Sequence, residues 1–252
     1  MNPEELISCA MDIGEQMLLS GAEVGRVETT VKLICTAYKC KRADVFTITS
    51  SIVVSIISEE GIHLTQTRRI QGATTDLTRL DRLNNLSREI CRTTPNYTCV
   101  HKKLCQICAG KTYPLWAEAL ASALIACSFA LFFGGKWMDG GIAALLGFGM
   151  RFSTWVLKSA GMNQVFVNAV SSALLSFCAI GLARLGFGQD ANMIIIGNIM
   201  LLIPGIALTN SLRDMISGDI MTGLLRFFDA ILVSAAIAAG YIFAAQLLGG
   251  GA

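Results

Sequence analysis

Charged residues are distributed unevenly along this chain of 252 residues, and no other feature constrains its fold more. Of its 38 Lys, Arg, Asp and Glu residues, 26 lie in residues 1–112 and 12 in residues 113–252. With 53% apolar and 15% charged residues, the chain is more apolar than soluble proteins, in which about a quarter of residues are charged. We therefore predict a membrane protein with a soluble domain in residues 1–112 and a transmembrane domain in residues 113–252.

Five stretches of the second domain are apolar enough, over a window of about 19 residues, to cross a hydrocarbon core about 30 Å thick. These predicted transmembrane helices are residues 114–134, 137–157, 163–184, 191–209 and 222–248. The first four are joined by short connections, which favours one compact α-helical bundle. Small residues at a spacing of four near the end, Ala236, Gly240 and Ala244, would allow close helix packing.

Basic residues that flank the spans predict the orientation of the bundle. The N-terminus is acidic, unlike a signal peptide, and an odd number of cysteines, nine, favours a reducing compartment, so we expect the first domain to be cytoplasmic. The cytoplasmic side then holds Lys102, Lys103, Lys111, Lys158, Arg213 and Arg226, whereas Lys136 and Arg184 face out. The C-terminus lies outside if all five spans cross the membrane, and inside if one is re-entrant.

The soluble domain is predicted to be a small α+β fold. Apolar residues recur at helical spacing in residues 4–19 and 23–39, with Ser20 as the N-cap of the second helix and Glu23 completing a capping box. Two or three antiparallel strands follow in residues 44–69, which are rich in β-branched side chains. A helix with Thr75 as its N-cap and a shorter one near residues 98–109 complete the domain.

A proline-glycine pair near the end of the fourth span, Pro204-Gly205, predicts a helix break at membrane depth. Broken helices free backbone groups that only a protein-lined, wet cavity can satisfy, and they are typical of transporter binding sites. The polar residues that follow are Asn210, Arg213, Asp214 and Asp219. A cation, two carboxylates and an amide suit a zwitterionic or carboxylated small solute. An ordinary polar loop is the alternative.

Polar residues inside the predicted spans are further candidates for transport, because such side chains are costly in lipid. They are Glu118, Arg151, Asn168, Asn198 and Asp229. Glu118 and Arg151 could instead reach the interface from near helix ends. Asp229 lies three residues after Arg226, so the two are either transport residues or an ion pair that neutralises itself.

Several blocks of residues together resemble the threonine/serine exporter family. They are Ser20-Gly21-Ala22-Glu23, Arg26-Val27-Glu28-Thr29, Ala43-Asp44-Val45-Phe46, Pro204-Gly205, Asn210, Arg213-Asp214, Gly218-Asp219 and Gly223. Fused members of the family have a cytoplasmic domain and two five-span halves, and this chain is similar to the domain plus the first half, the larger component of the two-chain form.

This resemblance implies a subunit of a secondary transporter in the bacterial inner membrane. Proton-coupled export of threonine and serine is implied, with small dicarboxylates such as succinate as the alternative substrates. It also implies a separate small membrane protein that carries the second transmembrane half. We expect a homo- or hetero-oligomer.

Other functional classes are less favoured by the residues. Cys99, His101, Cys105 and Cys108 include a helical spacing that could bind zinc, but we favour buried cysteines that act as small apolar residues, so we predict no metal and no cofactor. A membrane-anchored hydrolase would need Ser51 or Ser55 with His63 and Asp44, yet no glycine-rich nucleophile turn accompanies them, and we expect no enzyme. A net charge of +2 without a long basic run gives no reason to expect a nucleic-acid partner.

Overall fold

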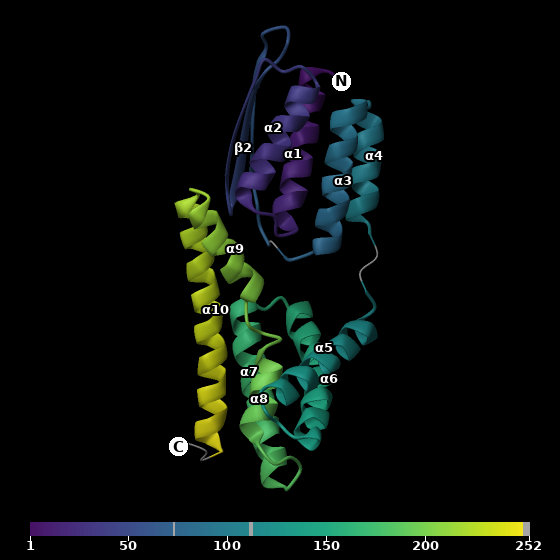
Figure 1. Ribbon diagram of the computed structural model, residues 1–252. Coiled ribbons are helices and arrows are strands. Elements are labelled where there is room, and N and C mark those ends of the chain that lie inside the picture. Colours follow the sequence, from purple (N-terminus) through teal and green to yellow (C-terminus); the bar gives the residue numbers. More distant parts are fainter. Residues whose placement is uncertain (73, 111–112, 249–252) are drawn as a thin grey trace. The chain divides into compact units, whose positions relative to one another are not determined.

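The computed structural model describes residues 1–72, 74–110 and 113–248 (Figure 1). Lys111 and the predicted end of the soluble domain at residue 112 lie outside these ranges. The chain forms two compact units. The first unit combines Met1–Lys111 with Thr209–Phe227, and the second combines Thr112–Leu208 with Phe228–Ala252. A short segment that follows the fourth predicted span is therefore built into the first unit.

The first unit is an α+β fold, as its sequence pattern predicts. Its elements are α1 (Pro3–Leu19), α2 (Val24–Ala37), β1 (Arg42–Ile48), β2 (Ser51–Ile57), β3 (His63–Arg69), α3 (Leu77–Thr93) and α4 (Tyr97–Cys108). The strands form an antiparallel sheet in the order β1-β2-β3. Ile52, Val54 and Ile56 alternate along β2 and are buried, because one face of the sheet packs on α1 and α2. Figure 1 shows α3 and α4 beyond these two helices.

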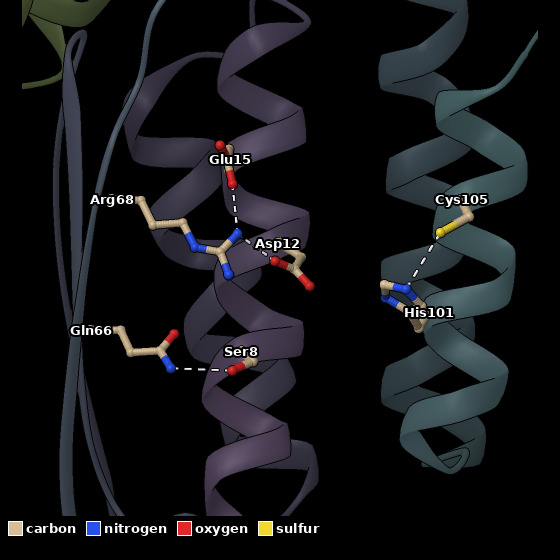
Figure 2. A network of polar contacts seen from close by, with 7 residues as sticks. All are labelled: Ser8, Asp12, Glu15, Gln66, Arg68, His101 and Cys105. Atoms are coloured by element: carbon tan, nitrogen blue, oxygen red, sulfur yellow. Dashed lines mark hydrogen bonds and ion pairs between the residues drawn. The ribbon is translucent and has the colours of Figure 1, made fainter.

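Polar side chains tie β3 to α1 at the edge of this core. Figure 2 shows Gln66 and Arg68 of β3 reaching toward α1, where Gln66 Nε2 donates to Ser8 Oγ at 3.1 Å. Arg68 Nη1 donates to Glu15 Oε2 at 2.6 Å and also pairs with Asp12. The inner face of β3 is thus held by hydrogen bonds and ion pairs, whereas that of β2 is held by apolar contacts.

The turn between α1 and α2 differs from the prediction. Ser20 is the C-cap of α1, and its hydroxyl donates to the Gln16 carbonyl at 2.7 Å, so it is not the N-cap of α2. Glu23 occupies the N-cap position of α2 without a side-chain capping bond. The predicted capping box is therefore wrong, because the Ser20 hydroxyl is used by the preceding helix. The predicted cap of α3 is also wrong, because Asp76 and not Thr75 is the N-cap and accepts from the Arg79 N–H at 2.9 Å.

The second unit contains helices suited to a membrane. Among the residues that the structure describes, four helices are long and apolar enough to cross one: α5 (Leu115–Phe132), α6 (Trp137–Ser159), α7 (Gln164–Arg184) and α10 (Ile220–Leu247). The fourth predicted span is instead divided between α8 (Ala191–Ile199) and α9 (Gly205–Ile216). Nine residues of helix rise only about 13 Å, so α8 alone is too short to cross the hydrocarbon core. The count of five spans stays a prediction.

Small residues bring the helices of the second unit close together. A Cβ atom on Gly197 of α8 would lie 2.7 Å from the carbonyl oxygen of Ala126 in α5. A Cβ on Gly147 of α6 would lie 2.8 Å from the Ala126 side chain, and one on Gly240 of α10 would overlap the carbonyl of Ala169 in α7. Backbones can approach this closely only where a side chain is missing, which is the usual basis of helix packing in membranes.

The cysteines of the first unit differ in exposure, and Cys40, Cys91 and Cys108 are half-buried. Cys9 and Cys35 are buried in the core, whereas Cys99 and Cys105 are exposed. Cys105 Sγ lies 3.6 Å from His101 Nε2, which Figure 2 also shows. Burial of Cys99 and Cys105 was therefore predicted wrongly, because they lie on the solvent side of α4. Within the ranges given above, no three His, Cys, Asp or Glu residues are arranged to hold a metal ion.

Thiol alkylation tests this arrangement. Burial raises the pKa of the Cys9 and Cys35 thiols to about 12, so at pH 8 both are almost wholly protonated and shielded. We expect a brief iodoacetamide treatment, read out by peptide mass spectrometry, to modify Cys99 and Cys105 more than about 100-fold faster than Cys9 and Cys35. Denaturant should abolish the difference. Equal rates in the native protein would contradict the packing of α1 and α2.

Candidate functional site

Charged residues at the end of α9 and the start of α10 meet the α1–α2 turn within the first unit. Arg213 and Asp214 lie in the last turns of α9, and Asp219 directly precedes α10. Arg226 lies two turns into α10. We call Glu23, Arg213, Asp214, Asp219 and Arg226 the charged cluster.

Arg226 forms the buried centre of the cluster. Its Nη1 lies 3.0 Å from Asp214 Oδ2, and its Nη2 donates to the Ala22 carbonyl at 2.9 Å. The two side chains are only 16% and 3% exposed. Removing one partner of a buried ion pair leaves the other charge uncompensated, so Asp214 and Arg226 depend on each other.

The carboxylates of the cluster lie at the N-terminus of α2. Asp214 accepts a hydrogen bond from the Val24 backbone N–H, and Asp219 Oδ2 lies 3.6 Å from the position that a Cβ on Gly25 would occupy. Helix α2 has no side-chain capping bond from its own N-cap and no acidic residue in its first turn. Carboxylates near a helix N-terminus accept hydrogen bonds from the free N–H groups and interact favourably with the positive end of the helix dipole. The α9–α10 connection thus supplies the cap that α2 lacks locally.

Glu23 and Arg213 form the exposed part of the cluster. They make an ion pair between the α1–α2 turn and α9, with side chains 29% and 57% exposed. A pair this exposed stabilises a fold by about 0–1 kcal/mol, so its contribution to folding is small. The pair nevertheless joins α9 to the α1–α2 turn within the first unit.

The environment of the cluster perturbs two carboxyl groups. Burial raises the pKa of Asp214, although the Arg226 charge opposes this, and the neighbouring Asp219 and Glu23 raise it further. Burial also raises the pKa of Glu28, whose Oε1 accepts from the Thr47 N–H at 2.9 Å. Asp214 in the cluster and Glu28 beside it therefore each bind a proton more readily than a solvated carboxylate does.

Two predicted site residues lie apart from these contacts. Asn210 of α9 is half-buried. Asp229 is exposed and forms no ion pair within the described part of the chain. The predicted ion pair of Arg226 with Asp229 is wrong, because the Arg226 side chain extends to Asp214 and the Ala22 carbonyl instead.

In the second unit, the structure pairs two of the intramembrane candidates. Arg151 Nε of α6 donates to Glu118 Oε2 of α5 at 2.8 Å. Both side chains are about a third exposed. The pair links the two helices, so Glu118 and Arg151 do not extend separately toward the interface.

Asn198 lies in the last turn of α8, next to the helix interruption. It is fully buried, and its Nδ2 donates to the Ile194 carbonyl at 3.0 Å. Its Oδ1 has no hydrogen-bond partner among the residues that the structure describes. Residues 200–204 then separate α8 from α9, so Pro204 directly precedes the first residue of α9, Gly205. An unsatisfied acceptor therefore lies one turn before the interruption.

Sequence reasoning missed a second buried acid, Asp139. It is 1% exposed and accepts hydrogen bonds from the backbone N–H groups of Lys136, Gln189 and Asp190, at 2.9, 2.6 and 3.2 Å. Its place three residues after the N-cap of α6 is the available signal. Asn168, a predicted candidate, lies on a buried polar face of α7, and the prediction missed the serines that share this face, Ser171, Ser172 and Ser176.

Comparison with known proteins gives a consistent result. The model of the threonine/serine exporter (ThrE) family matches residues 8–248. The chain is 24% identical to "Probable threonine/serine exporter" of Mycobacterium tuberculosis, covering 96% of this chain and 46% of that protein, and 27% identical to "Threonine/serine exporter" of Corynebacterium glutamicum, covering 96% and 51%. It is 25% identical to "Probable succinate transporter subunit YjjP" of Klebsiella aerogenes, covering 96% and 92%. The chain thus spans about half the length of the first two relatives, and no solved structure matches it.

Proposed function

Because this chain belongs to the threonine/serine exporter family, we propose that it is a subunit of a secondary transporter that exports threonine and serine from the cytoplasm. The four apolar helices suit a multi-pass membrane protein. We further propose that residues 1–112 form a cytoplasmic domain, that the transmembrane domain in residues 113–252 crosses the bacterial inner membrane with five spans, and that export is coupled to protons. A separate small membrane protein would carry the second transmembrane half.

The helix interruption beside Asn198 carries this proposal. A buried amide oxygen without a partner is costly unless something donates to it, and the ammonium or hydroxyl of a hydroxylated amino acid is a suitable donor. Broken helices are where transporters commonly bind their solutes. We propose that Asn198, with Pro204 and Gly205 at the interruption, lines the solute path, and we retain Glu118, Asn210 and Asp229 as transport residues.

Small dicarboxylates are the second candidate substrates. The relative matched over 92% of its length is named a succinate transporter subunit, and its length is close to that of this chain. A dicarboxylate carries no ammonium group, so it would depend on cations such as Arg151 rather than on the Asn198 oxygen.

An efflux assay separates these alternatives. Cells preloaded with isotope-labelled threonine, serine and succinate would express the chain with its partner, carrying Asn198→Ala or the matched control Asn192→Ala. Asn192 lies on the same helix but is exposed. We expect Asn198→Ala to lower threonine and serine efflux about tenfold, the effect of one lost hydrogen bond to a charged group, and Asn192→Ala to have no effect.

Two results would change the proposal. Efflux of succinate but not of threonine or serine, unchanged in Asn198→Ala, would move the substrate to dicarboxylates. Equal efflux from both variants, at equal amounts in the membrane, would remove Asn198 from the solute path.

A further inference from the structure

We propose that Glu23 and the Ala22 carbonyl are positioning groups for transport, which hold the α9–α10 connection on the first unit through Arg213 and Arg226. The transport role rests on the proposed function, whereas the contact itself does not. Helix α9 begins at the interruption after α8. Helix α10 is the longest of the four described helices that could cross a membrane. Contacts that hold the end of α9 and the start of α10 therefore restrain both ends of the α9–α10 connection. This connection joins the interrupted helix to the last predicted span.

The contacts show why the first unit is suited to this task. Arg226 joins Asp214 and the Ala22 carbonyl in a buried arrangement, so the connection is anchored where water is largely excluded. Asp214 in turn accepts from Val24 and so completes the N-terminus of α2. Because α2 depends on a cap from a segment almost 200 residues away, the turn and the connection are ordered together.

The same contacts argue against a direct role of Arg213 in binding solute. Its guanidinium is paired with Glu23, and a solute carboxylate would have to displace that partner. A docking role and a solute-binding role of Arg213 predict opposite results when the charges of residues 23 and 213 are exchanged. A docking pair still works when its charges are exchanged, whereas a solute carboxylate still needs a cation at residue 213.

The test uses Glu23→Arg, Arg213→Glu and the combined variant in the full-length protein with its partner. Arg26→Glu is the matched control, because Arg26 is an exposed cation on the first turn of α2 that forms no ion pair in the described ranges. Hydrogen exchange of the peptide that covers residues 20–27 measures docking without reference to transport. Initial efflux rates over a range of internal solute concentrations measure transport.

We expect each single reversal to speed exchange in residues 20–27 and to lower the maximal efflux rate about tenfold, with an unchanged half-saturating concentration. The combined variant should recover both quantities to within about threefold, and Arg26→Glu should leave both unchanged. Recovery of exchange without recovery of efflux would show that Arg213 acts on the solute itself and would overturn the positioning role.

Two further results would also overturn it. If neither single reversal changes exchange, the first unit does not hold the connection through this pair. If exchange follows the expected pattern but the unmodified protein exports none of the three solutes, the proposed function fails and the positioning role in transport fails with it, while the docking contact stands.

Discussion

Replacing Gly197 with leucine is expected to prevent the second unit from folding. The first side-chain carbon would lie 2.7 Å from the Ala126 carbonyl oxygen and 2.8 Å from the Ala130 nitrogen. Both are backbone atoms of α5, so no flexible side chain can move aside. Overpacking a core costs about 1–3 kcal/mol and sometimes more, and a leucine between two helix backbones lies at the upper end. We expect loss of the monodisperse peak in detergent, or a drop of about 10 °C in the unfolding temperature.

Gly141→Leu is the matched control for this prediction. It makes the same change on α6, where an added Cβ meets nothing within 4 Å. Apolar side chains are favourable on a lipid-facing helix surface, so the variant should unfold within a few degrees of the unmodified protein. Equal destabilisation by the two substitutions would mean that α8 does not pack on α5 as described.

Elements with a continuous local signal could be predicted from the sequence. Helix α7, Gln164–Arg184, almost coincides with the predicted span 163–184, because a mostly apolar stretch of about 20 residues without an internal charge favours a membrane-spanning helix. The strands were equally predictable, because β-branched side chains are concentrated in residues 44–69 and the structure forms β1, β2 and β3 over residues 42–69.

Contacts between distant residues could not be predicted in this way. The Arg213 side chain meets Glu23, 190 residues earlier, and Arg226 meets Ala22, 204 residues earlier. Sequence spacing identifies only neighbours on the same helix, so it suggested Asp229 as the ion-pair partner of Arg226 and missed Asp214. The residue types that carry the chemistry could be found, but their partners depend on how the α9–α10 connection packs.

Asp139 illustrates the same limit, and replacing it is the second substitution expected to have a large effect. Its carboxylate accepts from three backbone N–H groups, and two of these belong to the loop between α7 and α8. In Asp139→Ala all three partly buried donors lose their acceptor, at about 1–2 kcal/mol for each. We expect the free energy of unfolding to fall by about 3–6 kcal/mol, measured by denaturation in detergent, and the α7–α8 loop to become sensitive to protease.

Asp190 provides the control, because it is a nearby aspartate with a simpler role. It is the N-cap of α8, and within the described ranges its side chain accepts only from the Asn192 N–H, at 2.9 Å. Asp190→Ala should therefore cost only about 1 kcal/mol, and Asp190→Asn almost nothing, since asparagine caps helices as well as aspartate does. Asp139→Asn should remain clearly destabilising. If the asparagine oxygen accepts from the Gln189 and Asp190 N–H groups, its NH₂ group faces the Lys136 N–H, and two donors then face each other. If Asp139→Asn were as neutral as Asp190→Asn, the three hydrogen bonds would not be what fixes α8 against α6.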